Sequence, residues 1–132
     1  MQNPIESYWK QQMEKCKNVL ENNNFDAYLV KDSLEAHQII IKEIIPKIEV
    51  KSASWGDSMP LHATGVIDTL RKIPGINVIE TCAEGVPRDE IIERRRQALL
   101  ADLFFSVSNA LTETGKLVNL LLYGLQKSGP YL

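Results

Sequence analysis

Two short stretches of this sequence place hydroxyl and carboxylate side chains beside glycine, in turns where backbone amides can also bind a ligand. They are Gly56-Asp57-Ser58 and the run Asn109-Ala-Leu-Thr-Glu-Thr-Gly115. In the first, glycine permits a tight turn, Ser58 or Asp57 can cap a following helix, and free N–H groups attract an anion. A plain helix N-cap explains the same residues, and the carboxylate of Asp57 repels an anion. Both interpretations stay open for this turn.

The second stretch offers Glu113 as a carboxylate for acid–base or nucleophilic chemistry. The alternative is a surface turn residue, because the sequence shows no partner side chain for it. The threonines on either side have two alternatives as well, capping the turn or binding ligand oxygens. The candidate catalytic residue is therefore Glu113, and the candidate ligand-binding residues are Gly56, Asp57, Ser58, Thr112, Thr114 and Gly115.

Histidines and cysteines are too few and too dispersed to indicate a metal centre. His62 falls on the apolar stripe of its predicted helix, where we expect a partly buried histidine, with a general base as the alternative. We expect His37 at the surface and Cys82 as a buried thiol. Cys16 and Cys82 cannot supply the four thiolates of an iron–sulfur cluster, and no glycine-rich nucleotide-binding motif occurs. We therefore predict no metal site and no cofactor in this chain.

Strands and helices alternate along the chain, which predicts a parallel sheet with helices on both faces. Apolar and alternating runs predict strands at 25–31, 51–56, 76–81 and 102–108, with the sheet continuing into 116–124. Helical spacing and capping residues predict helices at 6–22, 32–47, 58–73 and 88–100. The predicted fold is a three-layer α/β/α arrangement with a mostly parallel sheet, forming a single domain over 1–132. Both candidate stretches then follow strands, at the edge where such sheets bind ligands.

Composition and charge argue against several classes of protein. The hydrophobic fraction of 44% and the charged fraction of 24% are those of a soluble globular protein. A net charge of −2, with scattered lysines and arginines, argues against a nucleic-acid surface. No apolar run approaches the roughly 20 residues that cross a bilayer, and the first residues lack signal-peptide features. We therefore expect a cytoplasmic protein that binds neither nucleic acid nor a membrane.

Two long segments resemble a known family. WGDSMPLHATGVIDTLRK is similar to the G-x-S-M-T-L…G-x-I-D-x-L-R segment of the lactate-utilisation (LUD) domain family. EGVPRDEIIERRRQALLADLFFSVSNALTETGKLVN is similar to that family's stretch ending in A-[IL]-T-E-x-G-x-L-x-N. The resemblance covers about residues 5–120 and implies similarity to the sugar-phosphate isomerase and CoA-transferase-like fold. After Asn119 the family pattern D-G-x-G-N-R-V-A-A is missing, so we expect a shortened member.

The resemblance also implies a part in oxidising lactate to pyruvate beside iron–sulfur oxidoreductase subunits. The first functional hypothesis is therefore an accessory component of lactate oxidation that acts through such partners. The second is an enzyme or sensor that binds a small anionic ligand, such as a sugar phosphate or acyl-CoA, at the strand-end loops. Whether the chain is itself an enzyme stays open between these hypotheses.

The apolar run from Leu117 to Leu125 bears on assembly. A parallel sheet is normally covered, and a long bare apolar edge favours association. We expect this run to pack against a second copy, which gives a homodimer. The alternative is that the run turns back as a helix and covers its own sheet, which leaves a monomer.

Overall fold

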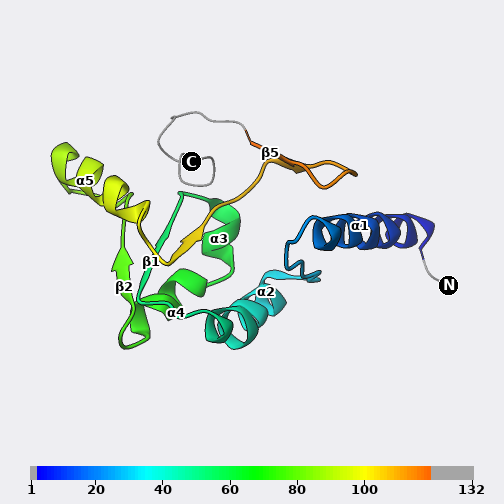
Figure 1. The fold of residues 1–132 in the computed structure, drawn as a ribbon, viewed down its shortest axis with the longest axis horizontal. Coiled ribbons are helices and arrows are strands. Elements are labelled where there is room, and N and C mark those ends of the chain that lie inside the picture. Colours follow the sequence, from blue (N-terminus) through cyan, green and yellow to red (C-terminus); the bar gives the residue numbers. More distant parts are fainter. Residues whose placement is uncertain (1–2, 120–132) are drawn as a thin grey trace. The chain divides into compact units, whose positions relative to one another are not determined.

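The structure, a computed structural model, describes residues 3–119, which form two compact units (Figure 1). Unit 1 comprises residues 3–31 and 108–119, and unit 2 comprises residues 32–107. No helix within the described part of the chain is long and apolar enough to cross a membrane. That residues 1–132 form a single domain stays a prediction.

Unit 2 contains a three-stranded parallel sheet in the order β2-β1-β3 (Figure 1). Its strands are β1 (Ser52–Trp55), β2 (Asn77–Ile79) and β3 (Leu103–Phe105). The register places Ala53 opposite Val78 on one side and opposite Leu103 on the other. The predicted α/β fold with a parallel sheet is confirmed, and so are the predicted strands near 51–56, 76–81 and 102–108.

Helices cover both faces of this sheet. They are α2 (Ser33–Ile39), continued by the turns η1 (Ile40–Ile44) and η2 (Ile45–Lys47), then α3 (Met59–Ala63), α4 (Val66–Lys72) and α5 (Arg88–Ala98). Ala53 and Trp55 face α3 and α4, with which they share the core. Because successive side chains alternate across a strand, Ser54 points to the other face, and α5 contacts β1 and β2.

The core of unit 2 lies between α4 and β1. Val66 and Leu70 are fully buried against Ala53, and Trp55 packs with Leu61 and Ile67. Complete burial of one leucine side chain contributes about 2 kcal/mol. On the other face Ser54 is also fully buried, and its hydroxyl donates to the Ile79 carbonyl oxygen at 2.7 Å. That hydrogen bond removes the cost of burying a polar group.

The predicted helix at 58–73 is wrong in one respect, because the chain forms two helices there. Gly65 has φ 70°, a left-handed conformation that ends α3 before α4 begins. The hydroxyl of Thr64 accepts from the Val66 N–H at 3.3 Å and donates to the Leu61 carbonyl oxygen at 2.7 Å. The break is therefore stabilised by local hydrogen bonds as well as by glycine.

Unit 1 contains α1 (Pro4–Asn22) and a hairpin of β4 (Ala110–Leu111) and β5 (Leu117–Val118). The predicted helix at 6–22 is confirmed, and its N-cap is Asn3, whose side chain accepts from the Ile5 N–H at 3.1 Å.

Two strand predictions in unit 1 are wrong. Residues 25–31 follow α1 without forming a strand, although their aromatic and aliphatic side chains suit one. Residues 117–118 pair antiparallel with β4 instead of extending the parallel sheet. The rest of the predicted strand, from residue 120 on, lies outside the described residues.

An exposed carboxylate joins the start of β1 to the start of β3. Asp102 Oδ2 accepts from the backbone N–H groups of Lys51 and Ser52, each at 2.9 Å, and from the Ser52 hydroxyl at 3.0 Å. In return, the Asp102 N–H donates to Ser52 Oγ at 3.1 Å. The hydrogen bonds from Lys51 and Ser52 stabilise the charged form, so the pKa of Asp102 is lower than usual.

We expect Asp102→Asn to destabilise the protein at neutral pH and to matter less as the pH falls. Because the folded-state pKa of Asp102 is lowered, its carboxylate contributes stability above the unfolded-state pKa. That stability is lost as the pH falls through the folded-state pKa. Urea unfolding of both proteins over a series of acid pH values measures the difference. Asp26→Asn, at an exposed carboxylate, is the control, and a difference independent of pH would contradict the assignment.

Candidate functional site

The carboxyl ends of the three parallel strands meet at one edge of the sheet in unit 2. Ligands of open α/β sheets bind at this edge, where loops lead from strands into helices. We call it the strand-end edge and define it by residues 56–58, which follow β1, and residues 80–82, which follow β2.

The first loop of the strand-end edge is a helix cap. Ser58 is the N-cap of α3, and its Oγ accepts from the Leu61 N–H at 3.5 Å. The Gly56 N–H donates to the Phe105 carbonyl oxygen at 2.9 Å, which joins the end of β1 to β3. Gly56 does not have a positive φ, so this turn does not use the conformational freedom expected of its glycine. The capping interpretation therefore describes the observed role of Ser58.

An exposed histidine lies beside this loop. His62 Nε2 is 3.6 Å from Asp57 Oδ1, and the two side chains are 49% and 63% exposed. The expectation that His62 is partly buried is wrong, because the break at Gly65 separates His62 from the apolar stripe of α4. Leu61 occupies the buried position of α3 instead. An imidazole beside a carboxylate can exchange a proton with a bound molecule.

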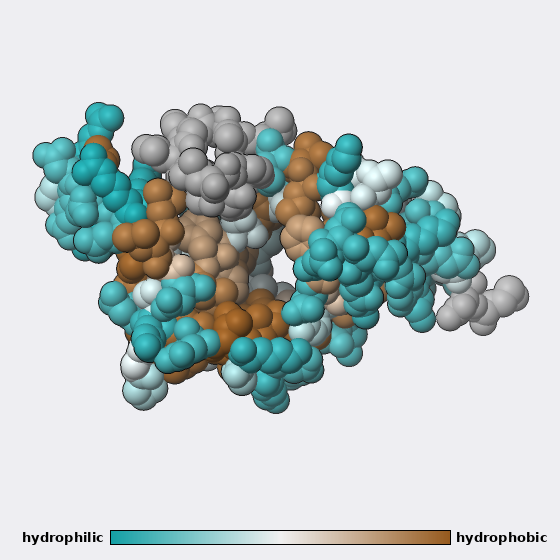
Figure 2. All heavy atoms as spheres, in the orientation of Figure 1, coloured by the Kyte–Doolittle hydropathy of each residue, from teal (hydrophilic) through white to brown (hydrophobic). Residues whose placement is uncertain are grey.

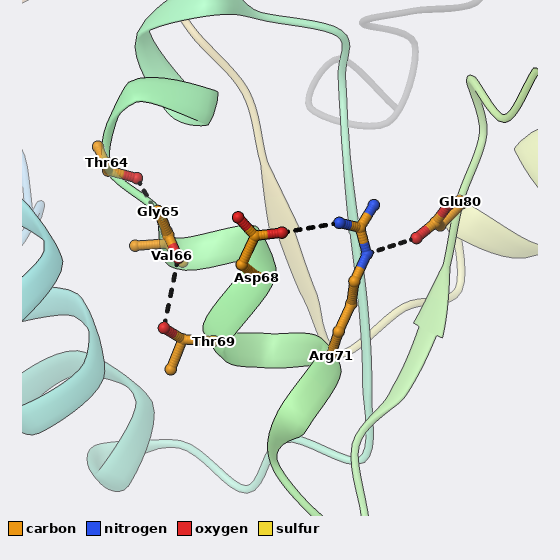
Figure 3. Close-up of polar contacts among 7 residues, drawn as sticks. All are labelled: Thr64, Gly65, Val66, Asp68, Thr69, Arg71 and Glu80. Atoms are coloured by element: carbon orange, nitrogen blue, oxygen red, sulfur yellow. Dashed lines mark hydrogen bonds and ion pairs between the residues drawn. The ribbon is translucent and has the colours of Figure 1, made fainter.

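Arg71 of α4 forms ion pairs with Glu80, which follows β2, and with Asp68 of its own helix (Figure 3). Its Nε donates to Glu80 Oε1 at 2.7 Å, and its Nη1 donates to Asp68 Oδ1 at 2.9 Å. The guanidinium lies 5.7 Å from the centroid of the Trp55 ring, within the range of a cation–π interaction. The hydrogen bond to Glu80 raises the pKa of Arg71, and burial acts in the opposite direction. These contacts hold the start of the second loop.

Thr81 joins the two loops. Its side chain is buried, and its hydroxyl donates to the Trp55 carbonyl oxygen at 3.2 Å. Because Trp55 directly precedes Gly56, the two loops lie side by side. Cys82 is exposed, so the expectation of a buried thiol is wrong: the neighbouring Thr81 takes the buried position. No local pattern in the sequence indicates which of these two neighbouring residues is buried.

His37 is half-buried, which contradicts its predicted place at the surface. Its Nδ1 lies 2.9 Å from the Thr64 carbonyl oxygen, and its Nε2 lies 3.4 Å from Thr69 Oγ1. The Thr69 hydroxyl also donates to the Gly65 carbonyl oxygen at 3.3 Å (Figure 3). His37 therefore ties α2 to the break between α3 and α4, a packing role.

The second candidate stretch forms the turn of the β4-β5 hairpin in unit 1. The Thr112 N–H donates to the Lys116 carbonyl oxygen, and the Lys116 N–H donates to Thr112 Oγ1, both at 2.9 Å. Thr112 Oγ1 and Thr114 Oγ1 lie 3.0 Å apart. Glu113 is exposed at the turn. The threonine hydroxyls thus form hydrogen bonds within the turn. The catalytic assignment of Glu113 stays a prediction.

Gly115 has a packing role in this turn. It is buried with φ 80°, and a Cβ placed there would lie 2.8 Å from Val19 Cγ1 and 2.9 Å from Asn23 Nδ2. The hairpin turn therefore approaches the C-terminal end of α1 more closely than any other residue type allows.

The predicted site residues fall into two groups. Gly56, Asp57 and Ser58 lie in unit 2, together with His62, whereas Thr112, Glu113, Thr114 and Gly115 lie in unit 1. Within residues 3–119, no group of three or more His, Cys, Asp or Glu side chains could hold a metal ion. The ligand-binding assignments of both groups stay predictions.

The fold and the strand-end edge define an α/β protein with polar side chains at the carboxyl ends of parallel strands. The family model of the LUD domain matches residues 13–122, which is most of the chain, so the protein belongs to the LUD domain family. It is therefore related to lactate-utilisation proteins. No significant match was found among curated proteins or among solved structures. The likeness to the sugar-phosphate isomerase and CoA-transferase-like fold accordingly stays a prediction.

We expect Gly115→Ala to destabilise the protein more than Gly75→Ala. Both glycines have positive φ, so each substitution costs about 1 kcal/mol in backbone strain. Only at Gly115 does the new Cβ also meet neighbouring atoms, since nothing lies within 4 Å of the Cβ position at Gly75. Chemical denaturation of the two variants measures the difference. Equal losses of stability would contradict the close approach of the turn to α1.

Proposed function

We propose that the protein is an accessory component of lactate oxidation to pyruvate and works with iron–sulfur partner subunits. The observation that carries the proposal is the match to the LUD domain family over residues 13–122. Oxidation of lactate to pyruvate releases two electrons and two protons, so an electron acceptor is required. The cysteines of this chain are Cys16 and Cys82, whereas iron–sulfur clusters are usually held by four protein ligands. Under the proposal, the acceptor cluster therefore belongs to a partner subunit.

Growth of the source organism on lactate tests this proposal. We expect deletion of the gene to abolish growth on lactate as the sole carbon source. Growth on pyruvate should continue, because pyruvate is the product of the proposed step. The wild-type gene on a plasmid should restore growth on lactate. Unchanged growth of the deletion strain on lactate would refute the proposal.

A second candidate function is the binding of a small anionic ligand, such as a sugar phosphate or acyl-CoA, at the strand-end edge. The observation that favours it is the position of His62, which is exposed beside Asp57 at the carboxyl edge of a parallel sheet. A protonated His62 would attract an anion, and Asp57 would repel it. Replacement of His62 and replacement of Asp57 should therefore change the affinity for an anion in opposite directions.

Thermal unfolding with lactate, pyruvate, a sugar phosphate and an acyl-CoA tests this second candidate. A ligand that binds only the folded protein raises the melting temperature. We expect Asp57→Asn to enlarge the shift, because it removes a repulsive charge, and His62→Asn to reduce it. If none of the four compounds shifts the melting temperature of either the wild type or Asp57→Asn, the candidate fails.

A further inference from the structure

The outer edge of β2 carries backbone groups that no other strand of residues 3–119 binds. β2 stands at one end of the order β2-β1-β3, so it pairs on its inner side alone, with β1 (Figure 1). The Asn77 N–H donates to the Lys51 carbonyl oxygen at 2.8 Å, which directs Asn77 toward β1. Because the backbone groups of successive strand residues point to opposite sides, the N–H and carbonyl groups of Val78 face away from β1.

A hollow of about 400 Å³ lies beside this edge. The three residues of β2 and Glu80 line one side of it, and Arg94 and Gln97 of α5 line the other. The Arg94 guanidinium marks one end, since its Nη1 donates to the Glu80 carbonyl oxygen at 3.4 Å. Figure 2 shows mostly hydrophilic atoms over α5 and hydrophobic atoms below that helix. Within unit 2, the hollow leaves room for a further strand beside Val78.

β2 has none of the devices that keep an edge strand apart from other strands. Such edges commonly carry Lys, Pro or a β-bulge. Asn77, Val78 and Ile79 are neutral, and they pair with β1 in an unbroken register. The charged residue that follows, Glu80, is bound at 2.7 Å by Arg71 of the same chain. Since the unpaired groups are those of an extended backbone, their partner is another extended strand.

The residues of β2 complement a second copy of themselves. In an antiparallel pair centred on Val78, the N–H of each Val78 donates to the carbonyl oxygen of the other. Asn77 then lies opposite Ile79, and Ile76 lies opposite Glu80. β-Branched side chains therefore meet at the centre, and no like charges face each other. The two Glu80 residues lie at opposite ends of the pair, about 13 Å apart along the strands.

We propose that two copies of the chain pair antiparallel through β2, about a twofold axis at Val78, and form one continuous six-stranded sheet. In such an interface each copy uses the same patch, and residue i contacts j as j contacts i. The strand order becomes β3-β1-β2-β2-β1-β3, so the edge of β2 is no longer bare. This interface does not depend on the proposed function in lactate oxidation. It also differs from the contact through the run 117–125 that the sequence led us to expect.

Light scattering and sedimentation of the full chain test this interface, and we expect a dimer at micromolar concentration. Val78→Pro removes the N–H that donates across the axis, and it should weaken dimerisation about 10-fold or more. Because proline is tolerated at the solvent side of an edge strand, circular dichroism should show that this variant stays folded. Ile79→Pro is the matched control. Its N–H faces β1, so this variant should lose far more stability in chemical denaturation than Val78→Pro does.

Disulfide cross-linking tests the register without a proline variant. In a background with Cys16→Ser and Cys82→Ser, Asn77→Cys and Ile79→Cys each supply one thiol. The proposed pairing places these positions opposite each other as a non-hydrogen-bonded pair, with Cα atoms about 4.5 Å apart, within the reach of a disulfide. A mixture of the two variants should therefore form a disulfide-linked heterodimer. Neither variant alone should cross-link, because like positions are diagonal neighbours about 7–8 Å apart.

Several outcomes would overturn this interface. A monomeric wild type would do so, and so would a dimer that Val78→Pro leaves intact. Absence of a disulfide in the mixture, or equal cross-linking of Asn77→Cys alone, would exclude the antiparallel pairing at Val78. Loss of the dimer in Leu121→Glu, with Val78→Pro still dimeric, would place the interface in the run 117–125 instead.

Discussion

The packing of unit 2 depends on one short strand that is covered on both faces. Three of the four residues of β1 are buried, and parallel neighbours flank the strand on both sides. A strand in this position tolerates only small or apolar side chains, unless each polar group finds a partner. Ala53 gives Val66 and Leu70 room to approach, and Ser54 satisfies its hydroxyl on the neighbouring strand. Both loops of the strand-end edge are attached to the carboxyl end of this strand.

Local sequence signals were enough to predict the parallel strands and the helix caps. Asp32 and Ser58 cap helices because their side chains reach the first-turn amides of their own helices. The break at Gly65 could not be predicted in the same way, since glycine within a helical pattern is compatible with a continuous helix. The contact that supports the break comes from His37, 27 residues away from Thr64 in sequence. Aromatic residues after α1 suited a strand but line a groove instead, and a short apolar run does not distinguish the two.

The position of the first loop of the candidate site was predicted from the sequence, but the side-chain contacts around that loop were not. The position of Ser58 follows from the strand and helix on either side of it, whereas the pairing of His62 with Asp57 depends on where α3 ends. Thr81 and Cys82 are adjacent in the sequence, but Thr81 is buried and Cys82 is exposed. Because side chains alternate between the two faces, an error of one position after a short strand assigns the buried place to the wrong residue. The run ending at Gly115 matches a family motif, but its threonines and glycine are used by a hairpin turn.

The two tryptophans of the chain are divided between the units, with Trp9 in unit 1 and Trp55 in unit 2. Trp55 is 5% exposed beneath the Arg71 guanidinium, and Trp9 is 59% exposed. Indole fluorescence shifts to longer wavelength when the ring becomes hydrated. Tryptophan fluorescence therefore gives each unit its own optical reporter. A shift in the emission of Trp55 reports opening of the sheet to water, and a shift in the emission of Trp9 reports a change in the surroundings of α1. Replacing either tryptophan by phenylalanine isolates the signal of the other.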